Sequence, residues 1–295
     1  MSHLILIDKP EGMTSFSAVA KVRRKLSQKR VGHTGTLDPM ATGVLPILTG
    51  RASRLSSMML ESDKRYSATV KLGVVTDTYD ITGSVIRGTA ANVTDGQFRD
   101  VCKTFLGKQK QLPPMYSAIK KDGVRLYELA RRGESVERAA RDIEIKEINV
   151  MGRISEDEYL IDVLCSKGTY IRSLAFDIGE KLGCGAALSA LRRTAVSGFT
   201  IEDCTPLEEF INSPDGDFLK SPELCVMHLK SVGVSQAQAN RFCHGGELDL
   251  GRLKDLPKLS RGEKLRVKFA DEFLGIGLAD TEKGVLKIGC IVKED

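Results

Sequence analysis

The sequence predicts an α+β protein that ends in a small all-β unit. Apolar residues recur at helical spacing in several segments, while other segments have the alternating or short apolar runs of strands. Helices and strands are interspersed along the first 200 residues, which is typical of a sheet covered by helices. From residue 261 to residue 292, three strand-like runs are separated by glycine-containing turns.

The first 30 residues predict a strand, a turn and a helix. Residues 4–7 form a short apolar run, and Lys9-Pro10-Glu11-Gly12 has the residues of a tight turn. Thr14 or Ser15 can cap a helix over 16–26, which carries apolar residues on one face and basic residues on the other.

The middle of the chain alternates between predicted helices and predicted extended segments. We expect a helix over 51–60, a strand over 66–72 and a helix over 94–105. Paired prolines force the segment 111–118 into an extended form, and a short helix follows over 125–132.

The last third predicts a strand pair, a helix, a linker and the β unit. The strands cover 143–154 and 159–166, and the helix runs to about Leu182. Prolines and glycines make 207–229 loop-like, so we expect two domains, residues 1–228 and residues 229–295.

Composition excludes several classes of protein. Of 295 residues, 41% are hydrophobic and 28% charged, as in ordinary globular proteins. No apolar run approaches the roughly 20 residues of a membrane span, and the N-terminus lacks the features of a signal peptide, so we expect a cytoplasmic protein without a membrane partner. The seven cysteines are scattered without a C-x-x-C pair, which argues against a disulfide framework or a zinc site.

Positive charge is concentrated near the N-terminus. The net charge is +5, but residues 1–65 contain 11 Lys and Arg against 5 Asp and Glu. Such a cluster can be a solvated helix face, and it also suits the attraction of a polyanion.

One carboxylate stands out in the segment 31–47, VGHTGTLDPMATGVLPI. Asp38 lies among glycines and a proline, where regular helix or strand is disfavoured, and His33 is the one other ionisable side chain of the segment. Composition alone favours a structural turn here. The alternative is a loop that presents a single acid to a cleft.

Several strings resemble the motifs of one family. GHTGTLDPMATGVLPI (residues 32–47), SDKRY (62–66) and SKGTYIR (166–172) are similar, in this order, to motifs of the TruB family of tRNA pseudouridine synthases. Asp77-Thr78-Tyr79-Asp80 matches the family's D-T-x-D segment, and the resemblance covers residues 4 to about 199.

The resemblance implies catalytic roles for three side chains. Asp38 would be the catalytic carboxylate, Tyr66 would pack against the target base, and Arg172 would pair with the carboxylate. An arginine beside a partly buried acid keeps the acid ionised and fixes its rotamer. Without the resemblance, Tyr66 would be read as a core residue and Arg172 as part of a surface ion pair.

Further residues would bind the substrate. Tyr170 and Leu191 would complete the pocket for the base, and we expect additional contacts from His33, Lys9 and Lys64. By pattern alone, Leu191 is a helical core residue, His33 a turn histidine and Lys9 an exposed turn lysine.

The family also implies a fold and an activity. We expect the pseudouridine synthase fold, with a central mixed, largely antiparallel sheet flanked by helices and loops, followed by a pseudo-barrel similar to a PUA domain. The chain would convert the uridine at position 55, in the T-loop of the T-arm of tRNA, to pseudouridine on a flipped-out base. Whether Asp38 attacks C6, attacks C1' or removes a sugar proton stays open.

This chemistry needs neither metal nor cofactor, and the sequence contains no phosphate-cradling or metal-binding motif. We expect a monomer that works without an obligatory protein partner. Two alternatives stay open: a non-catalytic protein that binds or folds tRNA, and a pseudouridine synthase for another RNA, as in the dyskerin branch that uses guide RNA and protein partners.

Overall fold

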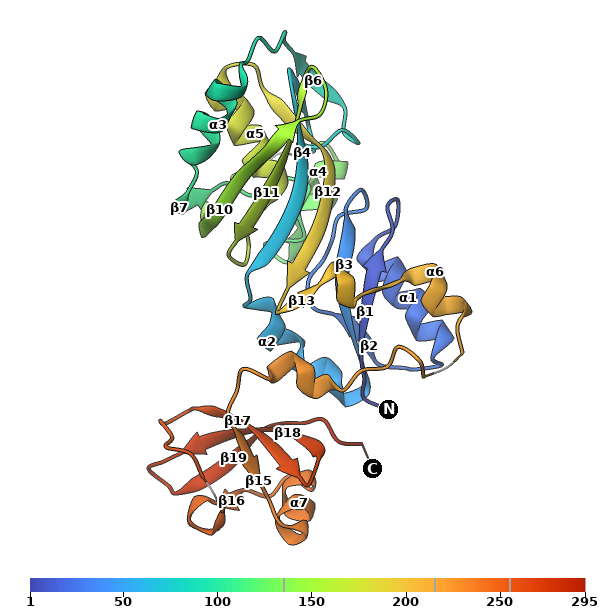
Figure 1. Cartoon of the computed structure of the whole chain (residues 1–295), viewed down its shortest axis with the longest axis vertical. Coiled ribbons are helices and arrows are strands. Elements are labelled where there is room, and N and C mark those ends of the chain that lie inside the picture. Colours follow the sequence, from blue (N-terminus) through green and yellow to red (C-terminus); the bar gives the residue numbers. More distant parts are fainter. Residues whose placement is uncertain (135, 215, 255, 295) are drawn as a thin grey trace.

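A computed structural model describes residues 1–134, 136–214, 216–254 and 256–294. The molecule is elongated, with a large sheet in its upper part and a smaller sheet at the C-terminal end (Figure 1). The N-terminus lies where the two parts meet. The fold is α+β with a mixed, largely antiparallel sheet, as the sequence predicts.

The large sheet has ten strands in the order β14-β1-β3-β12-β4-β11-β10-β7, with β2 beside β3 and β13 beside β12. The pairs β1–β14 and β3–β12 are parallel, and the others are antiparallel. Its strands are β1 Leu4–Lys9, β2 Val31–His33, β3 Thr42–Thr49, β4 Lys64–Leu72, β7 Gly107–Gln111, β10 Arg141–Arg153, β11 Glu158–Cys165, β12 Ala186–Val196, β13 Phe199–Thr200 and β14 Thr205–Pro206.

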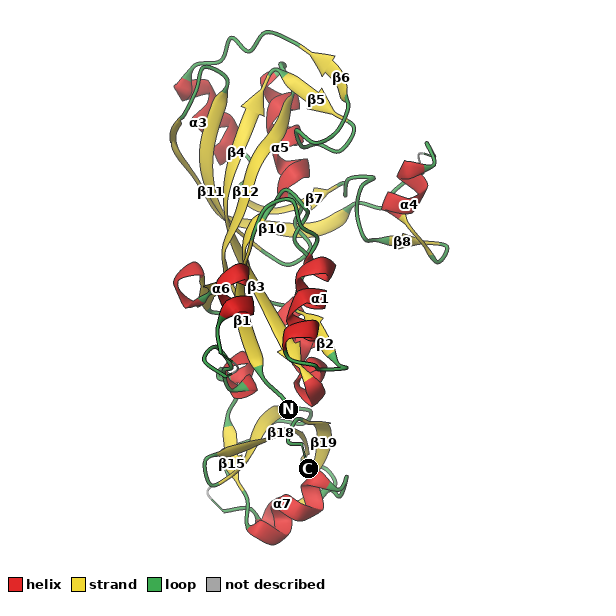
Figure 2. Cartoon of the chain, turned by 90° about the vertical axis from the view of Figure 1, so that its right-hand side faces the viewer, coloured by secondary structure: helices red, strands yellow, loops and turns green. Residues whose placement is uncertain are grey.

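Helices cover this sheet (Figure 2). Helices α3 and α5 contact each other, with α3 against β10 and α5 against β12 and β4, while α1 packs near β2 and α6. The helices of this part are α1 Ser15–Lys25, α2 Ser56–Leu60, α3 Asp95–Lys103, α4 Leu126–Arg131, α5 Ile171–Leu182 and α6 Leu207–Asn212. The short strands outside the large sheet are β5 Val74–Thr76, β6 Val85–Gly88, β8 Lys120–Lys121 and β9 Val124–Arg125.

The C-terminal part is a curled five-stranded sheet that fits a PUA-like half-barrel, in the order β15-β17-β18-β19-β16. Its elements are β15 Ser231–Gly233, α7 Gln236–Cys243, β16 Leu248–Asp249, β17 Lys264–Phe269, β18 Glu272–Asp280 and β19 Val285–Ile291. The three C-terminal strands match the predicted β unit, whereas β15, α7 and β16 were not anticipated.

Four local expectations differ from the structure. The residues around Leu191 form strand β12 instead of a helix, and β3 begins at Thr42, inside the segment in which regular structure was thought unlikely. The expected helix over 51–60 is a 3₁₀ helix, Gly50–Leu55, followed by α2. The linker contains α6 and the 3₁₀ helix Pro222–Val226 between its loops, and Asp215 of this linker lies outside the described residues.

A shared apolar cluster joins the two parts. It combines Leu4, Val44 and Leu48 of the large sheet with Phe273 and Ile276 of the small one. Separate clusters fill the interior of each part. The boundary between residues 228 and 229 stays a prediction, because the shared cluster crosses it.

A clasp at the chain ends reinforces this junction. A carboxylate oxygen of Glu294 lies 2.6 Å from the amino group of Met1. The other oxygen accepts hydrogen bonds from the Ser2 hydroxyl at 2.8 Å and from the Arg51 backbone N–H at 3.1 Å. The last described residue is thereby fixed to the two residues that open the chain, just before β1, and to the 3₁₀ helix after β3.

Candidate active site

Asp38 lies in the loop between β2 and β3, and the start of α1 holds that loop in place. The Ser15 hydroxyl accepts a hydrogen bond from the Leu37 N–H at 2.8 Å and donates one to the Leu37 carbonyl at 3.1 Å. The Gly12 N–H donates to the Pro39 carbonyl at 2.9 Å. Both residues that flank Asp38 are thus anchored, so the loop presents the carboxylate in a defined position.

Lys9 also supports this loop. Its side chain is fully buried, and its ammonium group donates to the carbonyls of Pro10 at 2.8 Å, Met13 at 2.6 Å and Pro39 at 3.4 Å. Burial lowers the pKa of Lys9 to about 8. Lys9 was expected as an exposed turn residue or as a substrate contact. In the structure it is buried and connects the first turn to the Asp38 loop by hydrogen bonds.

Arg172, at the start of α5, faces Asp38. Its Nε atom lies 2.8 Å from an Asp38 carboxylate oxygen, although the N–H does not point along this line, so the contact is an ion pair without a hydrogen bond. The Arg172 side chain is 5% exposed and that of Asp38 is 36% exposed. The acid is therefore accessible, while the arginine that orients it is shielded from water.

The other edge of the guanidinium is fixed by three groups. It donates to the carbonyls of Thr78 and Tyr116, each at 2.9 Å, and lies 3.6 Å from a carboxylate oxygen of Asp80. Asp80 is itself buried and accepts hydrogen bonds from Thr82. The Arg172 guanidinium thus lies between two carboxylates. Burial of Arg172 and Asp80 strengthens these interactions.

A cleft of about 320 Å³ surrounds this pair. Six of the eight site residues predicted from the sequence line it: Asp38, Lys64, Tyr66, Tyr170, Arg172 and Leu191. His33 and Lys9 are not among the described residues that line it. The residues that sequence reasoning missed in its walls include Ser117 and Arg193.

The apolar wall of the cleft comes from neighbouring strands. Tyr66 on β4 is opposite Arg193 on β12, and Leu191 lies two residues earlier on β12, so the three side chains share one face of the sheet. Burial raises the pKa of the Tyr66 phenol, so the ring is neutral. Tyr66 and Leu191 are 7% and 8% exposed, and together they provide a surface on which a flat base can lie.

Tyr170 lines the cleft just before α5 and is held by Gln111. The side-chain amide of Gln111 accepts from the Tyr170 N–H at 2.8 Å and donates to the Tyr170 carbonyl at 3.0 Å. Burial raises the pKa of this phenol too. Gln111, itself buried, thereby fixes the segment that precedes Arg172 to the extended stretch at the end of β7.

Lys64, which lines the cleft, and His33, which does not, both have a lowered pKa. Burial and the positive charge of Arg193 lower the pKa of both. The Lys64 ammonium donates to the Ser62 carbonyl at 2.6 Å, and the His33 Nδ1 accepts from the Gly35 N–H at 3.2 Å. His33 is consequently neutral at pH 7 in this arrangement.

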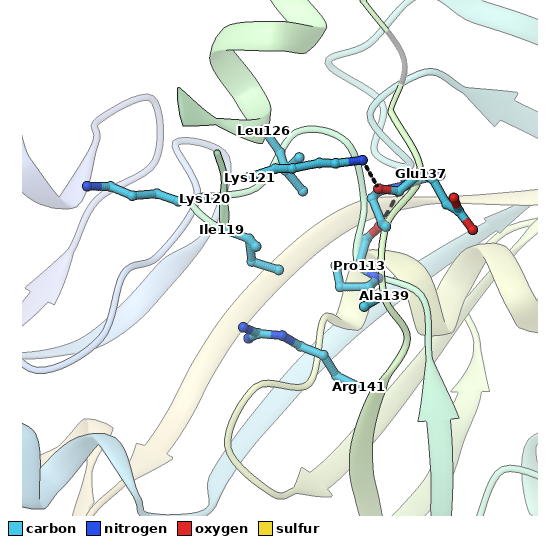
Figure 3. A pocket seen from close by; sticks show the side chains of 9 residues that line it. Pro113, Ile119, Lys120, Lys121, Leu126, Glu137, Ala139 and Arg141 are labelled. Carbon is cyan, nitrogen blue, oxygen red and sulfur yellow. Dashed lines mark hydrogen bonds between the residues drawn. The ribbon is translucent and has the colours of Figure 1, made fainter. Parts of the chain in front are cut away.

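A second cavity of about 410 Å³ has Ile119, Lys120 and Lys121 in its walls (Figure 3). The two residues before them, Ser117 and Ala118, line the cleft itself. The second cavity is predominantly basic, with Lys120, Lys121, Arg138 and Arg141 in its walls against Glu137. The basic character of the surface therefore continues past the Asp38 cleft. Within the described residues, no group of three or more His, Cys, Asp or Glu side chains could hold a metal ion.

The chain matches two family models. Residues 23–171 match the N-terminal domain of the TruB family of pseudouridylate synthases, which is half of the chain. The chain belongs to this family. Residues 172–215 match the C-terminal domain of tRNA pseudouridylate synthase B. The TruB family resemblance read from the motifs is therefore confirmed.

Curated relatives agree over nearly the whole chain. The tRNA pseudouridine synthase B of Alkaliphilus oremlandii is 41% identical over 96% of this chain and 94% of its own length. That of Azoarcus sp. strain BH72 is 43% identical over 93% of this chain and 90% of its own length. As a TruB family member the chain is a pseudouridine synthase, an isomerase that acts on RNA.

Solved structures show the same fold. A chain from an H/ACA RNP bound to a substrate RNA containing 2'-deoxyuridine superposes with a TM-score of 0.75 at 25% identity, covering 99% of this chain and 85% of the other. A chain from a Cbf5-Nop10-Gar1 complex gives a TM-score of 0.75 at 26% identity over the same shares. No helix among the described residues is long and apolar enough to span a membrane.

Proposed function

We propose that this TruB family member isomerises the uridine at position 55 in the T-loop of tRNA, with Asp38 as the essential carboxylate. The tRNA substrate comes from the names of its relatives. The observation that carries the proposal is the Asp38–Arg172 pair, 2.8 Å apart, inside a cleft that Tyr66 and Leu191 line.

The cleft has the groups that the reaction needs. An ionised carboxylate must act on the sugar or the uracil, and the detached base must be held away from water until it rejoins through C5. Arg172 keeps Asp38 oriented, and the apolar wall retains the base. We propose Tyr66 and Arg172 as the other catalytic residues, with Tyr170, Leu191 and Lys64 binding the substrate.

The base must leave its stack to reach Asp38. Unstacking costs a few kcal/mol, which roughly 1 to 3 kcal/mol per base of stacking on aromatic rings can offset together with phosphate contacts. The basic cavity beside the cleft and the basic residues near the N-terminus supply positive charge for the RNA backbone. We propose His33 as a further substrate contact, while the buried Lys9 supports the Asp38 loop. The chain acts on tRNA as a monomer, without an obligatory protein partner.

The test is modification of tRNA by the purified chain alone. We expect pseudouridine at position 55, located by mass spectrometry, and release of tritium from C5-labelled uridine. Asp38→Asn should abolish both while leaving tRNA binding and thermal unfolding nearly unchanged. The matched control is Asp100→Asn, because Asp100 is 76% exposed and pairs with Lys103 on the surface. Tight tRNA binding without any pseudouridine would instead support a non-catalytic RNA-binding protein.

A further inference from the structure

Arg193 is a buried arginine for which the Asp38 mechanism has no use. It is 1% exposed and lines the cleft beside Tyr66. Its Nε donates to the Val44 carbonyl at 2.8 Å and its Nη2 to the Gly35 carbonyl at 3.2 Å. These neutral acceptors fix the plane of the guanidinium but leave its charge uncompensated.

The contrast with other arginines of the large sheet and its cover is clear. Arg172 lies between Asp38 and Asp80, and the neighbouring Arg192 holds Asp8 at 2.6 Å. Within the described residues, no ion pair joins Arg193 to a carboxylate. An unpaired buried charge costs several kcal/mol, so a buried arginine normally has an acidic partner.

A close approach of two strands fixes the backbone of Arg193. Gly43 on β3 is paired with Arg193 on β12, and a Cβ on Gly43 would lie 2.2 Å from the Arg193 carbonyl oxygen. Gly43 also has a φ of +103°, which a side chain disfavours. The close approach of β3 and β12 places Arg193 at the floor of the cleft, where its charge also lowers the pKa of Lys64 and His33 in addition to burial.

The cleft therefore contains a positive charge that a bound anion can neutralise. A backbone phosphate is attached to two sugars, so it fits the rim of the cleft better than its floor. The floor, between Tyr66 and Leu191, fits a flat base. We propose that Arg193 stabilises the negative charge that uracil carries after its bond to the ribose breaks. This inference rests on the proposed function and assigns a charge-stabilising role to a residue outside the Asp38–Arg172 pair.

The bonding changes define that charge. When N1–C1' breaks, the electron pair leaves with N1 and uracil becomes an anion. An Asp38 oxygen bonds to C1', or Asp38 takes the C2' proton. C5 of the anion then bonds to C1'. In the first route this displaces the Asp38 oxygen from C1', and in the second Asp38 returns the proton to C2'. Finally C5 loses its proton and N1 gains one. Positive charge at the pocket floor stabilises the anion between these steps.

The experiment compares Arg193→Met and Arg193→Lys with the control Arg192→Met in single-turnover assays on tRNA. We expect Arg193→Met to lower the rate by about 10²- to 10³-fold, as loss of one charge-stabilising donor does elsewhere. Arg193→Lys should recover much of that rate, and tRNA affinity should hardly change. An unchanged Arg193→Met rate would overturn the inference alone, whereas a wild-type protein that makes no pseudouridine in tRNA would overturn the proposed function.

A second substrate separates charge stabilisation from packing. Fluorine at C5 makes uracil a more stable anion, so in tRNA containing 5-fluorouridine the rate loss of Arg193→Met, measured as disappearance of 5-fluorouridine, should shrink. An equal loss on both substrates would mean a structural role. If Arg193→Met does not fold, inhibition of the wild-type protein by free bases tests the inference. 5-Nitrouracil, which is ionised at neutral pH, should inhibit better than uracil. Equal inhibition would contradict the inference.

Discussion

The large sheet and the C-terminal sheet differ in what they bury. The interior of the first contains Lys9, Asp80, Gln111, Arg172 and Arg193, whereas the polar residue buried in the described C-terminal sheet is Asp280. Asp280 lies at the end of β18 and pairs with the half-exposed Lys287 at 2.6 Å. Because buried polar groups cost stability, their concentration around one cleft supports the proposal that this cleft is the active site.

We expect the largest effect from Arg172→Met, which removes a buried cation from the large-sheet part of the molecule. It leaves Asp80 buried without its cation and Asp38 without its orienting partner, so we expect turnover to fall on the order of 10³-fold. Stability should fall by about 3 to 5 kcal/mol, since a broken buried pair is costly. Single-turnover rates and urea unfolding measure both. Arg65→Met is the control: Arg65 is 38% exposed, so loss of its pair with Asp162 should cost about 1 kcal/mol or less.

Leu286→Ala sharpens the contrast from the other side. Leu286 is fully buried in the apolar cluster of the C-terminal sheet. We expect a loss of about 2 to 5 kcal/mol in the free energy of unfolding. The single-turnover rate at saturating protein and moderate temperature should stay at the wild-type value. A large rate loss in the folded variant would show that the C-terminal sheet shapes the cleft.

Lys9 gives a prediction that depends on pH. Its pKa in the folded chain, about 8, lies below the ordinary value of 10.5, so between these values the unfolded chain binds the extra proton. Stability should therefore rise with pH in this window, by up to about 1.4 kcal/mol per pH unit. The difference in unfolding free energy between wild type and Lys9→Met isolates this contribution. If this difference in unfolding free energy did not change between pH 8 and 10, the pKa of Lys9 would not be lowered. The hydrogen bonds to the three carbonyls would then keep the ammonium group protonated.

The smallest effect should come from a surface pair of the C-terminal sheet. Arg261 and Glu282 are 68% and 65% exposed. Arg261→Ala should change the free energy of unfolding by no more than about 0.5 to 1 kcal/mol, because water screens both charges. Thermal unfolding measures this. A larger loss would place Arg261 in a contact that its exposure does not indicate.

Local patterns predicted much of the fold. Helices α1, α3, α4 and α5 and the pair β10–β11 lie within a few residues of the expected positions. Their apolar periodicity and turn residues are local signals. Strand β12 was missed because Ala186–Val196 has the composition of a helix, and its pairing with both β3 and β4 is decided by tertiary contacts.

That single error also hid Arg193. In a strand, adjacent side chains point to opposite faces, so Arg192-Arg193 must direct one guanidinium inward. The expectation of a helix removed this signal. Asp80 belonged to a recognised motif, but its approach to Arg172 joins residues 92 positions apart, which spacing in the sequence does not reveal. The motifs identified most of the cleft, and the structure added the groups that support it.

The clasp of Glu294 on Met1 has a consequence for protein synthesis. The residues before β1 emerge from the ribosome early, yet Glu294, which follows β19, holds them. Leu4 and Leu6 of β1 likewise pack in the cluster that contains Phe273 and Ile276 of the C-terminal sheet. A nascent chain must therefore keep Leu4 and Leu6 incompletely covered until the C-terminal sheet has been synthesised. Chains that terminate before this sheet retain an exposed apolar strand, a feature by which chaperones and proteases can distinguish them from the folded enzyme.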